Sequence, residues 1–334
     1  MSRVAVVGGG VIGCAVAERL SRDGHQVTLF ERDQLGSKAS GAAAGELSPS
    51  ARPGDSESLA LFPELVARIE KDSAMSVEYR VQQGLQPAFT EEEAALLRQG
   101  SGRWLDAAEC RRLEPALSHD VLGAVLMEHA HLTPPRFVRA LALSAATHGA
   151  EIREGTPAAG FDIARNEARA VRTPTGPLRA DWFVIAAGPW TREVASTAGL
   201  DVDVRPQRGQ LAALDPGSLV LRRSIFWSGG YLVPKGDGTI IAGGTEEDSG
   251  FDARPTVEGI ASLLEFARRL APALASATIL RTWAGLRPVT PDGVPIVATS
   301  EVANLIIATG HHRKGILLAP AAAATVASLI GTAG

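Results

Sequence analysis

The chain has 334 residues, of which 45% are hydrophobic and 21% charged, values that are ordinary for a globular protein large enough to build two domains. Its formal net charge of −4 provides no excess of positive charge with which to bind nucleic acid or an anionic membrane surface. Its two cysteines, Cys14 and Cys110, have no metal-ligand or Cys-x-x-Cys neighbour, and this usage suits a reducing cytoplasm.

The N-terminal stretch predicts a strand, a turn, a helix and a second strand. Val4–Val7 is a short apolar run, Cys14–Arg22 has an Ala-rich helical pattern, and Val27–Phe30 is a second apolar run that ends at Glu31. The segment Gly8–Gly13 between the first run and the helix contains Gly-x-Gly-x-x-Gly. Together these features predict a β–α–β unit that binds a dinucleotide.

Each glycine of this motif has a separate task. Gly8 allows the tight turn, Gly10 lets backbone amides approach a pyrophosphate, and Gly13 lets helix and strand pack closely. The helix N-terminus then offers N–H donors and partial positive charge to the phosphates. Glu31 lies near the expected spacing of about 20 residues after the last glycine, where a carboxylate binds ribose hydroxyls. A glycine-rich turn before a core helix would not explain Glu31.

The following segments supply further elements of the same domain. Small residues dominate Gly36–Gly45, which either lets backbone approach a flat ligand or forms a flexible loop. Periodicity and capping signals predict helices at Leu59–Glu78, after a Thr90 cap, at Asp106–Leu113, and from a Thr133 N-cap to His148. Strands are predicted at Gly123–Glu128, in a small sheet at Glu151–Glu154 and Arg169–Thr173, and at Asp181–Gly188. The last of these ends in small residues, so its carboxyl end is expected to abut the ligand.

The predicted elements then change to short strands joined by turns, and the earlier strand–loop–helix pattern returns near the C-terminus. Short strands between turn signals are predicted at Gln210–Leu214, Arg222–Phe226, Tyr231–Pro234 and Thr239–Gly243, with a helix at Val257–Leu270. A strand at Asn304–Thr309, a loop at Gly310–Gly315 and a helix at Ile316–Ile330 resume the earlier pattern. Because that helix is shorter than the ~20 residues of a membrane span and contains Pro320, we expect it to be buried in the protein.

The expected fold is therefore α/β with an α+β second domain. A Rossmann-like nucleotide-binding domain covers residues 1–80, 132–203 and 281–334. A mainly antiparallel-sheet substrate-binding domain covers residues 81–131 and 204–280. The two domains are interleaved along the chain.

Several motifs in series resemble one family, the FAD-dependent D-amino-acid oxidases. They are Val6–Gly13, Ala42–Gly45, Ala180–Trp190, Arg205–Gln210, Tyr231–Pro234, Trp283–Pro288 and Gly310–Pro320. Within the family they are most similar to the glycine oxidases of thiamine biosynthesis. The resemblance extends from Arg3 to about Ile330.

The resemblance implies a bound FAD. The family's covalent members use a cysteine near the C-terminal loop, and no cysteine follows Cys110, so the FAD is expected to be non-covalent. Glu31 would bind the adenosine ribose, and His311–Leu317 would surround the pyrimidine edge of the flavin. The full set of expected FAD contacts is Gly8, Gly10, Val11, Ile12, Gly13, Glu31, Arg32, Ser40, Ala43, Ala44, Gly45, Glu46, Ala158, Ala187, Gly188, Gly310, His311, His312, Arg313, Lys314, Gly315, Ile316 and Leu317.

The reaction implied by the resemblance is oxidative deamination of glycine or a small amino acid. A hydride passes from Cα to flavin N5, the imine hydrolyses to a 2-oxo acid and ammonia, and O2 reoxidises the flavin to H2O2. Arg287 would bind the substrate carboxylate, Tyr231 would donate its hydroxyl to it, and Arg313 would line the substrate through its backbone. The alternatives are that Arg287 pairs with Asp292, that Tyr231 is only a core residue on its strand, and that the Arg313 side chain only caps the loop.

Some positions depart from the family pattern or stay open. Glu46 and Glu246 replace apolar pocket residues and either favour a larger, cationic substrate or point to solvent, while Phe226 lacks a hydroxyl and Gly229 lacks a polar side chain. Lys314 either favours oxygen reduction or is, more simply, an exposed lysine. His311 and His312 are expected to be flavin-loop residues rather than metal ligands.

Rival functions share the N-terminal motif. They are a D-amino-acid dehydrogenase that uses a quinone, the flavin domain of a tRNA-modifying enzyme, a non-catalytic FAD-binding protein, and a simple NAD-dependent dehydrogenase. The acidic charge balance disfavours the tRNA enzyme. The expected partners are a small amino acid and O2, with no nucleic acid and no membrane, in the cytoplasm; a homo-oligomer is an open possibility.

Overall fold

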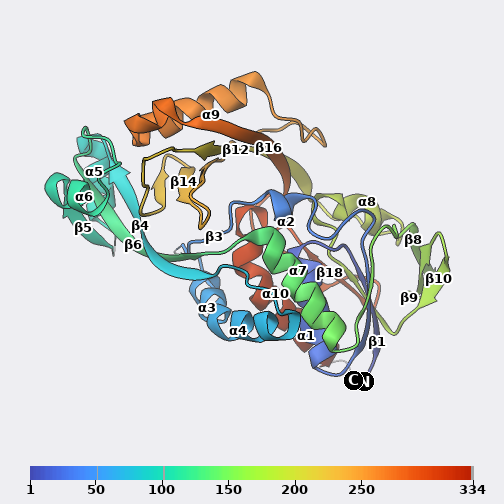
Figure 1. The fold of residues 1–334 in the computed structure, drawn as a ribbon. Coiled ribbons are helices and arrows are strands. Elements are labelled where there is room, and N and C mark those ends of the chain that lie inside the picture. The colour runs from blue at the N-terminus through green and yellow to red at the C-terminus, as the bar shows by residue number, and fades with distance from the viewer. Residues whose placement is uncertain (51, 101, 332–334) are drawn as a thin grey trace. The chain divides into compact units, whose positions relative to one another are not determined.

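The computed structural model describes residues 1–50, 52–100 and 102–331. The chain forms two compact units, each assembled from separate segments. The first unit comprises Met1–Tyr79, Leu132–Gln207 and Leu286–Gly334, and the second comprises Arg80–His131 and Arg208–Gly285. Figure 1 shows their elements along the chain.

A largely parallel sheet forms the centre of the first unit. Its strand order is β17-β18-β11-β1-β2-β7, and only β17 runs antiparallel to its neighbour. The strands are β1 (Arg3–Val7), β2 (Gln26–Phe30), β7 (Glu151–Arg153), β11 (Trp182–Ile185), β17 (Ile296–Thr299) and β18 (Leu305–Thr309). The expected α/β class with a Rossmann-like sheet is therefore confirmed. Val4–Val7 of β1 are buried because parallel strands have helices on both faces.

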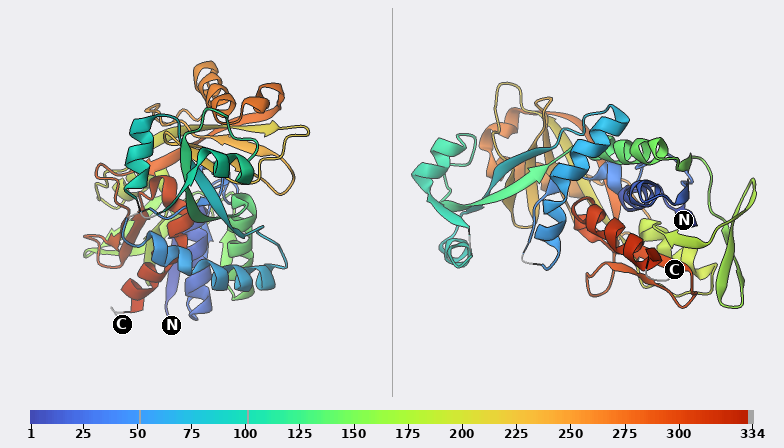
Figure 2. Two further views of the ribbon diagram at one scale, coloured as in Figure 1. Left: turned by 90° about the vertical axis from the view of Figure 1, so that its left-hand side faces the viewer. Right: turned by 90° about the horizontal axis from the view of Figure 1, so that it is seen from below.

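Helices pack closely around this sheet. They are α1 (Val11–Arg22), α3 (Asp55–Ala60), α4 (Phe62–Ser73), α7 (Pro134–Thr147), α8 (Thr191–Ser196) and α10 (Gly315–Gly331), with the single turn α2 at Ala39–Ala42. Helix α1 packs against both α7 and α10, as Figures 1 and 2 show. Its buried positions Cys14–Ala17 are small, which lets the neighbouring helix axes approach.

Two local predictions for this unit were wrong. The strand at Glu151–Arg153 does not belong to a small sheet, because it pairs with β2 in the parallel sheet; the small sheet is instead β8 (Gly160–Ala164), β9 (Glu167–Thr173) and β10 (Gly176–Arg179). The helix predicted at Leu59–Glu78 is two helices, α3 and α4, and left-handed Ala74 ends the second. Thr133 is the N-cap residue of α7, as predicted, and its hydroxyl donates to Glu78 at 2.5 Å.

Strands β4 (Arg80–Ala88) and β6 (Gly123–His131) form a long antiparallel ribbon at one side of the second unit. Its sheet runs in the order β16-β12-β15-β14-β13-β4-β6, with β5 (Arg103–Asp106) beside β6. The remaining strands are β12 (Arg205–Asp215), β13 (Ile225–Trp227), β14 (Gly230–Pro234), β15 (Ile240–Gly243) and β16 (Thr278–Val289), of which β12 and β16 each begin in one unit and end in the other. Most pairs are antiparallel; β13 and β4 are parallel.

Helices close the core of the second unit. They are α5 (Glu91–Arg98), α6 (Ala107–Leu113) and α9 (Val257–Leu270). Thr90 caps α5 and Asp106 caps α6, each in a reciprocal capping box with the glutamate three residues later. Leu85, Ile225 and Leu232 contribute fully buried side chains to this core.

The C-terminal helix α10 is strongly apolar. With the preceding turn it forms a 20-residue helical stretch, His312–Gly331, long and apolar enough by composition to cross a membrane. In the structure this helix packs against α1 and α3 of the first unit. Ile316, Leu317 and Val326 are buried there. It is a core helix of this unit, as predicted, although the helical stretch is longer than the helix predicted at residues 316–330 because the turn at His312–Lys314 extends it.

Candidate functional site

The turn between β1 and α1 accepts only glycine at its key positions. Gly8 has a φ of +112°, and a Cβ added to it would lie 2.4 Å from the Ala186 carbonyl oxygen. A Cβ on Gly13 would lie 1.9 Å from the Gly8 carbonyl oxygen. Gly10, in contrast, has space around it, and only the Ser40 hydroxyl lies near its added Cβ, at 3.3 Å. The outer glycines therefore shape the turn, while Gly10 leaves its surface open.

The start of α1 has the features of an anion site. The N-cap residue of α1 is Gly10, which has no side chain, and no acidic residue lies in the first turn of this helix among the described residues. The nearby Ser40 hydroxyl accepts a hydrogen bond from the Val11 N–H at 2.9 Å. Backbone N–H groups and the helix dipole at a helix N-terminus favour a phosphate. The residues present thus fit the diphosphate of a dinucleotide.

Glu31 lies where β2 ends, and the backbone fixes its carboxylate. One oxygen accepts a hydrogen bond from the Gly9 N–H at 2.7 Å and the other from the Asp33 N–H at 2.8 Å. The Glu31 carbonyl also accepts from Thr156, which brings the segment leading to Ala158 beside it. The carboxylate is therefore oriented before any ligand binds.

Neighbouring predicted residues gather at the same edge of the sheet. The Arg32 guanidinium lies over the Trp190 ring, 4.1 Å from its centroid. Ala187 and Gly188 lie just after the end of β11, and Thr309 at the end of β18 donates its hydroxyl to the Gly188 carbonyl at 3.0 Å. The carboxyl ends of β1, β2, β11 and β18 thus converge, at the place where ligands bind in open α/β sheets.

The small-residue run Gly36–Gly45 is an ordered part of this region. It includes the single turn α2, and Ala44 is buried. Gly45 has a φ of +87°, and an added Cβ would lie 2.1 Å from the Leu132 carbonyl oxygen. Ala43 and Glu46 flank these positions, Glu46 being half-buried at the start of β3 (Glu46–Leu47). The absence of side-chain bulk therefore lets two backbone segments meet here.

The Gly310–Gly315 loop connects β18 to α10. Gly310 has a φ of +77°, and an added Cβ would lie 2.5 Å from the Thr290 side chain. His312–Lys314 form a short 3-10 turn, and α10 begins at Gly315. His312 Nε2 lies 2.7 Å from Gln207 Oε1. Gln207 was within a motif that supported the family resemblance, but sequence reasoning assigned it no role.

Arg287 is placed beside this loop by backbone pairing. Val289, at the end of β16, forms an antiparallel bridge with His311. Arg287 is two residues earlier on the same strand and is half-buried. Asp292, its alternative partner, is exposed and accepts from the Val294 N–H at 2.9 Å. The strand of Arg287, the residue predicted to bind the substrate carboxylate, therefore lies beside the Gly310–Gly315 loop within the first unit.

His311 is buried at the centre of the loop. Its side chain is 3% exposed, and neither ring nitrogen has a hydrogen-bond partner among the described residues. Burial lowers the pKa of His311 to about 4, so the imidazole is neutral at physiological pH. Across residues 1–50, 52–100 and 102–331, no cluster of His, Cys, Asp and Glu is arranged to hold a metal ion.

The charged residues of the loop differ in exposure. Arg313 is exposed. Lys314 is not the exposed lysine that sequence reasoning favoured, because its side chain is only 27% exposed and pairs with Asp55 at 3.3 Å. Asp55 is fully buried and was not identified from the sequence. An isolated acidic residue such as Asp55 has no local sequence pattern that would predict its pairing with Lys314.

Tyr231 belongs to the second unit, where it lies on β14 opposite Phe226 of β13 and Gly243 of β15. A Cβ on Gly243 would lie 2.6 Å from the Tyr231 ring, so glycine lets the ring lie flat on the sheet. The Phe226 ring makes an edge contact with His129, a buried histidine that sequence reasoning did not identify. Gly229 and Glu246 lie beyond the ends of β13 and β15.

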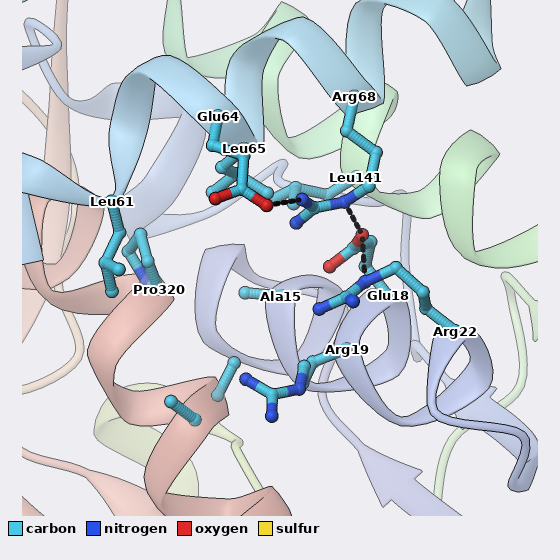
Figure 3. Close-up of a pocket in the computed structure, with 12 residues that line it drawn as sticks. Ala15, Glu18, Arg19, Arg22, Leu61, Glu64, Leu65, Arg68, Leu141 and Pro320 are labelled. Carbon is cyan, nitrogen blue, oxygen red and sulfur yellow. Dashed lines mark hydrogen bonds and ion pairs between the residues drawn. The ribbon is translucent and has the colours of Figure 1, made fainter.

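A separate cavity of about 200 Å³ lies among helices α1, α4, α7 and α10 of the first unit. Figure 3 shows Glu18 between Arg22 and Arg68, with Arg19 facing the same space. Glu18 is buried and accepts from Arg68 Nε at 2.8 Å. None of the predicted site residues lines this cavity. Its charges are paired, and it is distinct from the sheet edge described above.

Comparison with known proteins identifies the family. Residues 3–329 match the family model described as FAD dependent oxidoreductase. The chain belongs to that family. FAD is therefore its cofactor, and the features of this chain that suit the dinucleotide are the start of α1, which has no acidic residue in its first turn, and the oriented Glu31.

Individual relatives cover nearly the whole chain. It is 34% identical to glycine oxidase of Geobacillus kaustophilus, over 98% of this chain and 92% of that one. It is 35% identical to the bifunctional protein ThiO/ThiG of Trichormus variabilis, but spans about half, 52%, of that longer protein. Among solved structures, glycine oxidase from Bacillus cereus superimposes with a TM-score of 0.94 at 32% identity, covering 100% of this chain and 96% of that one.

Proposed function

We propose that this flavoprotein oxidises a small amino acid, with glycine as the first candidate, and transfers the electrons to O2. The observation that carries the proposal is the bridge between Val289 and His311, which puts the strand of Arg287 beside the loop that begins α10. The similarity to glycine oxidases supports the same substrate class. From the resemblance of its motifs to the glycine oxidases of thiamine biosynthesis, we also propose that the enzyme contributes to that pathway in the cytoplasm.

The residues of this chain would have distinct tasks. Bound FAD supplies the acceptor for the hydride that leaves the substrate Cα, and O2 then takes the electrons to form H2O2. Arg287 binds the substrate carboxylate in fork geometry, because a guanidinium presents two parallel N–H donors to two oxygens. Tyr231 is proposed as a further donor to the carboxylate, and the backbone of Arg313 as a contact with the substrate.

The first turn of α10 has an electrostatic task. A reduced flavin bears negative charge at its pyrimidine edge, and a helix N-terminus stabilises negative charge. Helix α10 begins at Gly315 without an acidic residue in its first turn, within the described part of the chain. The buried, neutral His311 adds no positive charge there. The helix dipole and backbone N–H groups are therefore the proposed source of stabilisation.

The direct test is a visible spectrum of the holoenzyme during anaerobic addition of amino acids. We expect glycine or sarcosine to bleach the flavin band, and admission of air to restore it with release of H2O2. Bleaching that air does not reverse would indicate a dehydrogenase with another acceptor. A flavin band that neither glycine, sarcosine nor small D-amino acids bleach would contradict the proposed substrate class.

A further inference from the structure

A buried charged cluster contacts residues Gly310–Gly315, the loop that we call the flavin loop. Asp55 is fully buried at the start of α3, and one of its oxygens accepts from both the N–H and the hydroxyl of Ser50, at 2.9 and 2.7 Å. The Lys314 ammonium lies 3.3 Å from the same carboxylate oxygen and also donates to the Ser48 carbonyl. One lysine of the flavin loop thus holds two points of the segment Ser48–Ser58.

The cluster is charged in spite of its burial. Burial by itself would raise the pKa of Asp55, but hydrogen bonds from Ser50 and the nearby Lys314 outweigh it and hold that pKa below its usual value. Burial lowers the pKa of Lys314, and the Asp55 charge opposes part of that shift. Removing one partner of a buried ion pair is strongly destabilising because it leaves an uncompensated charge, so the two groups depend on each other.

The same segment has two other attachments to the C-terminal part of the unit. The Arg52 guanidinium donates to the Gly293 carbonyl at 2.8 Å. The buried Ser58 hydroxyl donates to the Leu317 carbonyl at 2.7 Å. Leu317 lies in the first turn of α10, so Ser58 and Lys314 fasten the segment on both sides of the helix start.

We propose that Lys314 is a positioning residue that fastens the segment Ser48–Ser58 to the flavin loop and so holds the loop in the conformation that retains FAD. Its ammonium is committed to Asp55 and Ser48, and it acts through them rather than as an independent cation for oxygen. The inference depends on FAD as cofactor and not on the identity of the substrate.

The test compares four holoenzymes: wild type, Lys314→Met, Lys314→Arg and, as a matched control, Lys71→Met at an exposed position on α4. Hydrogen exchange of peptides covering 47–60 and 308–318 is measured by mass spectrometry. FAD release after dilution is followed by flavin fluorescence. We expect Lys314→Met to speed exchange in both peptides and FAD release by about tenfold, equivalent to about 1.4 kcal/mol. Lys314→Arg should restore most of both, and Lys71→Met should change neither.

A second variant covers the case in which Lys314→Met folds poorly because Asp55 is left unpaired. The double variant Lys314→Met/Asp55→Asn removes that buried charge, and it should fold yet still show fast exchange and fast FAD release. Unchanged exchange and unchanged FAD release in Lys314→Met or in the double variant would overturn the proposal. Faster exchange spread over all peptides would also overturn it, since that indicates global destabilisation. Both readouts are independent of whether any amino acid reduces the flavin.

Discussion

Two glycine-bounded turns lie at the carboxyl edge of the parallel sheet, and they are built in different ways. In the Gly8–Gly13 turn the two outer glycines are required by backbone crowding, because the added Cβ atoms of Gly8 and Gly13 would meet carbonyl oxygens. The Gly310–Gly315 loop is held by side chains, including His312 on Gln207 and Lys314 on Asp55. The first turn therefore depends on glycine at two positions, whereas the second depends on the pairs that its side chains form.

The difference is tested most strongly by adding one methyl group to each turn. Gly13→Ala places a Cβ 1.9 Å from the Gly8 carbonyl oxygen, which neither backbone segment can relieve without shifting. Gly315→Ala places its Cβ no closer than 3.8 Å to its neighbours, an ordinary contact. We expect Gly13→Ala to abolish FAD binding and to cost at least about 3 kcal/mol of stability, at the upper end of overpacking effects. Gly315→Ala should retain FAD. FAD content is measured by absorbance and stability by thermal unfolding. A Gly13→Ala protein that still contains FAD would refute the steric argument.

This contrast also explains what could be predicted from the sequence. The β–α–β unit follows from local patterns, because apolar runs, glycine spacing and Glu31 all lie within about thirty residues. The antiparallel strands β14 and β15 were predicted for the same reason, since turn residues at Lys235–Gly238 join them.

Long-range pairings could not be predicted in this way. Strands β4 and β16 were not predicted, and β7 was assigned to the wrong sheet, because its partner β2 is far away in sequence. The Lys314–Asp55 pair joins residues on different segments, and neither has a local signal. Burial of Lys314 depends on how α3 packs against α10, which periodicity does not reveal.

Substitution of Arg287 provides the second test, because it should weaken substrate binding without altering either glycine-bounded turn. Arg287→Ala removes the proposed fork to the substrate carboxylate and leaves the glycines untouched. We expect the KM for glycine to rise by about 100-fold or more, in line with about 3 kcal/mol for a charge-assisted pair. FAD content should stay near that of wild type. Arg287→Lys should recover only part of the loss, since a lysine lacks the planar fork. Equal losses of flavin and activity in Arg287→Ala would make Arg287 structural.

The buried His311 of the Gly310–Gly315 loop is expected to make the stability of the protein depend on pH. Its folded pKa of about 4 lies below the unfolded value near 6.5, so the unfolded state binds more protons between these values. The stability from burying the neutral ring is complete above pH 6.5 and declines as the pH falls towards 4, by up to about 3 kcal/mol. We expect His311→Gln to flatten this part of the stability profile, measured by urea unfolding at pH 7, 6, 5 and 4.5. The exposed His119→Gln serves as the control, and a His311→Gln profile parallel to wild type would contradict the assignment.

The smallest effect is expected at the far end of α1, where the helix is held by charge rather than by glycine. Glu18 is buried between Arg68 at 2.8 Å and Arg22 at 3.5 Å, and both arginines are partly exposed. Glu18→Gln keeps the shape but removes the charge, and because solvent screens the arginines we expect a loss of about 1–2 kcal/mol. The loss should shrink at high salt and in the Arg68→Met background, where part of the pairing is already absent. FAD affinity should stay unchanged, because the dipole acts within the first turn of the helix. A Glu18→Gln protein that binds FAD more weakly would show that the nucleotide turn depends on the whole of α1 and not on its glycines alone.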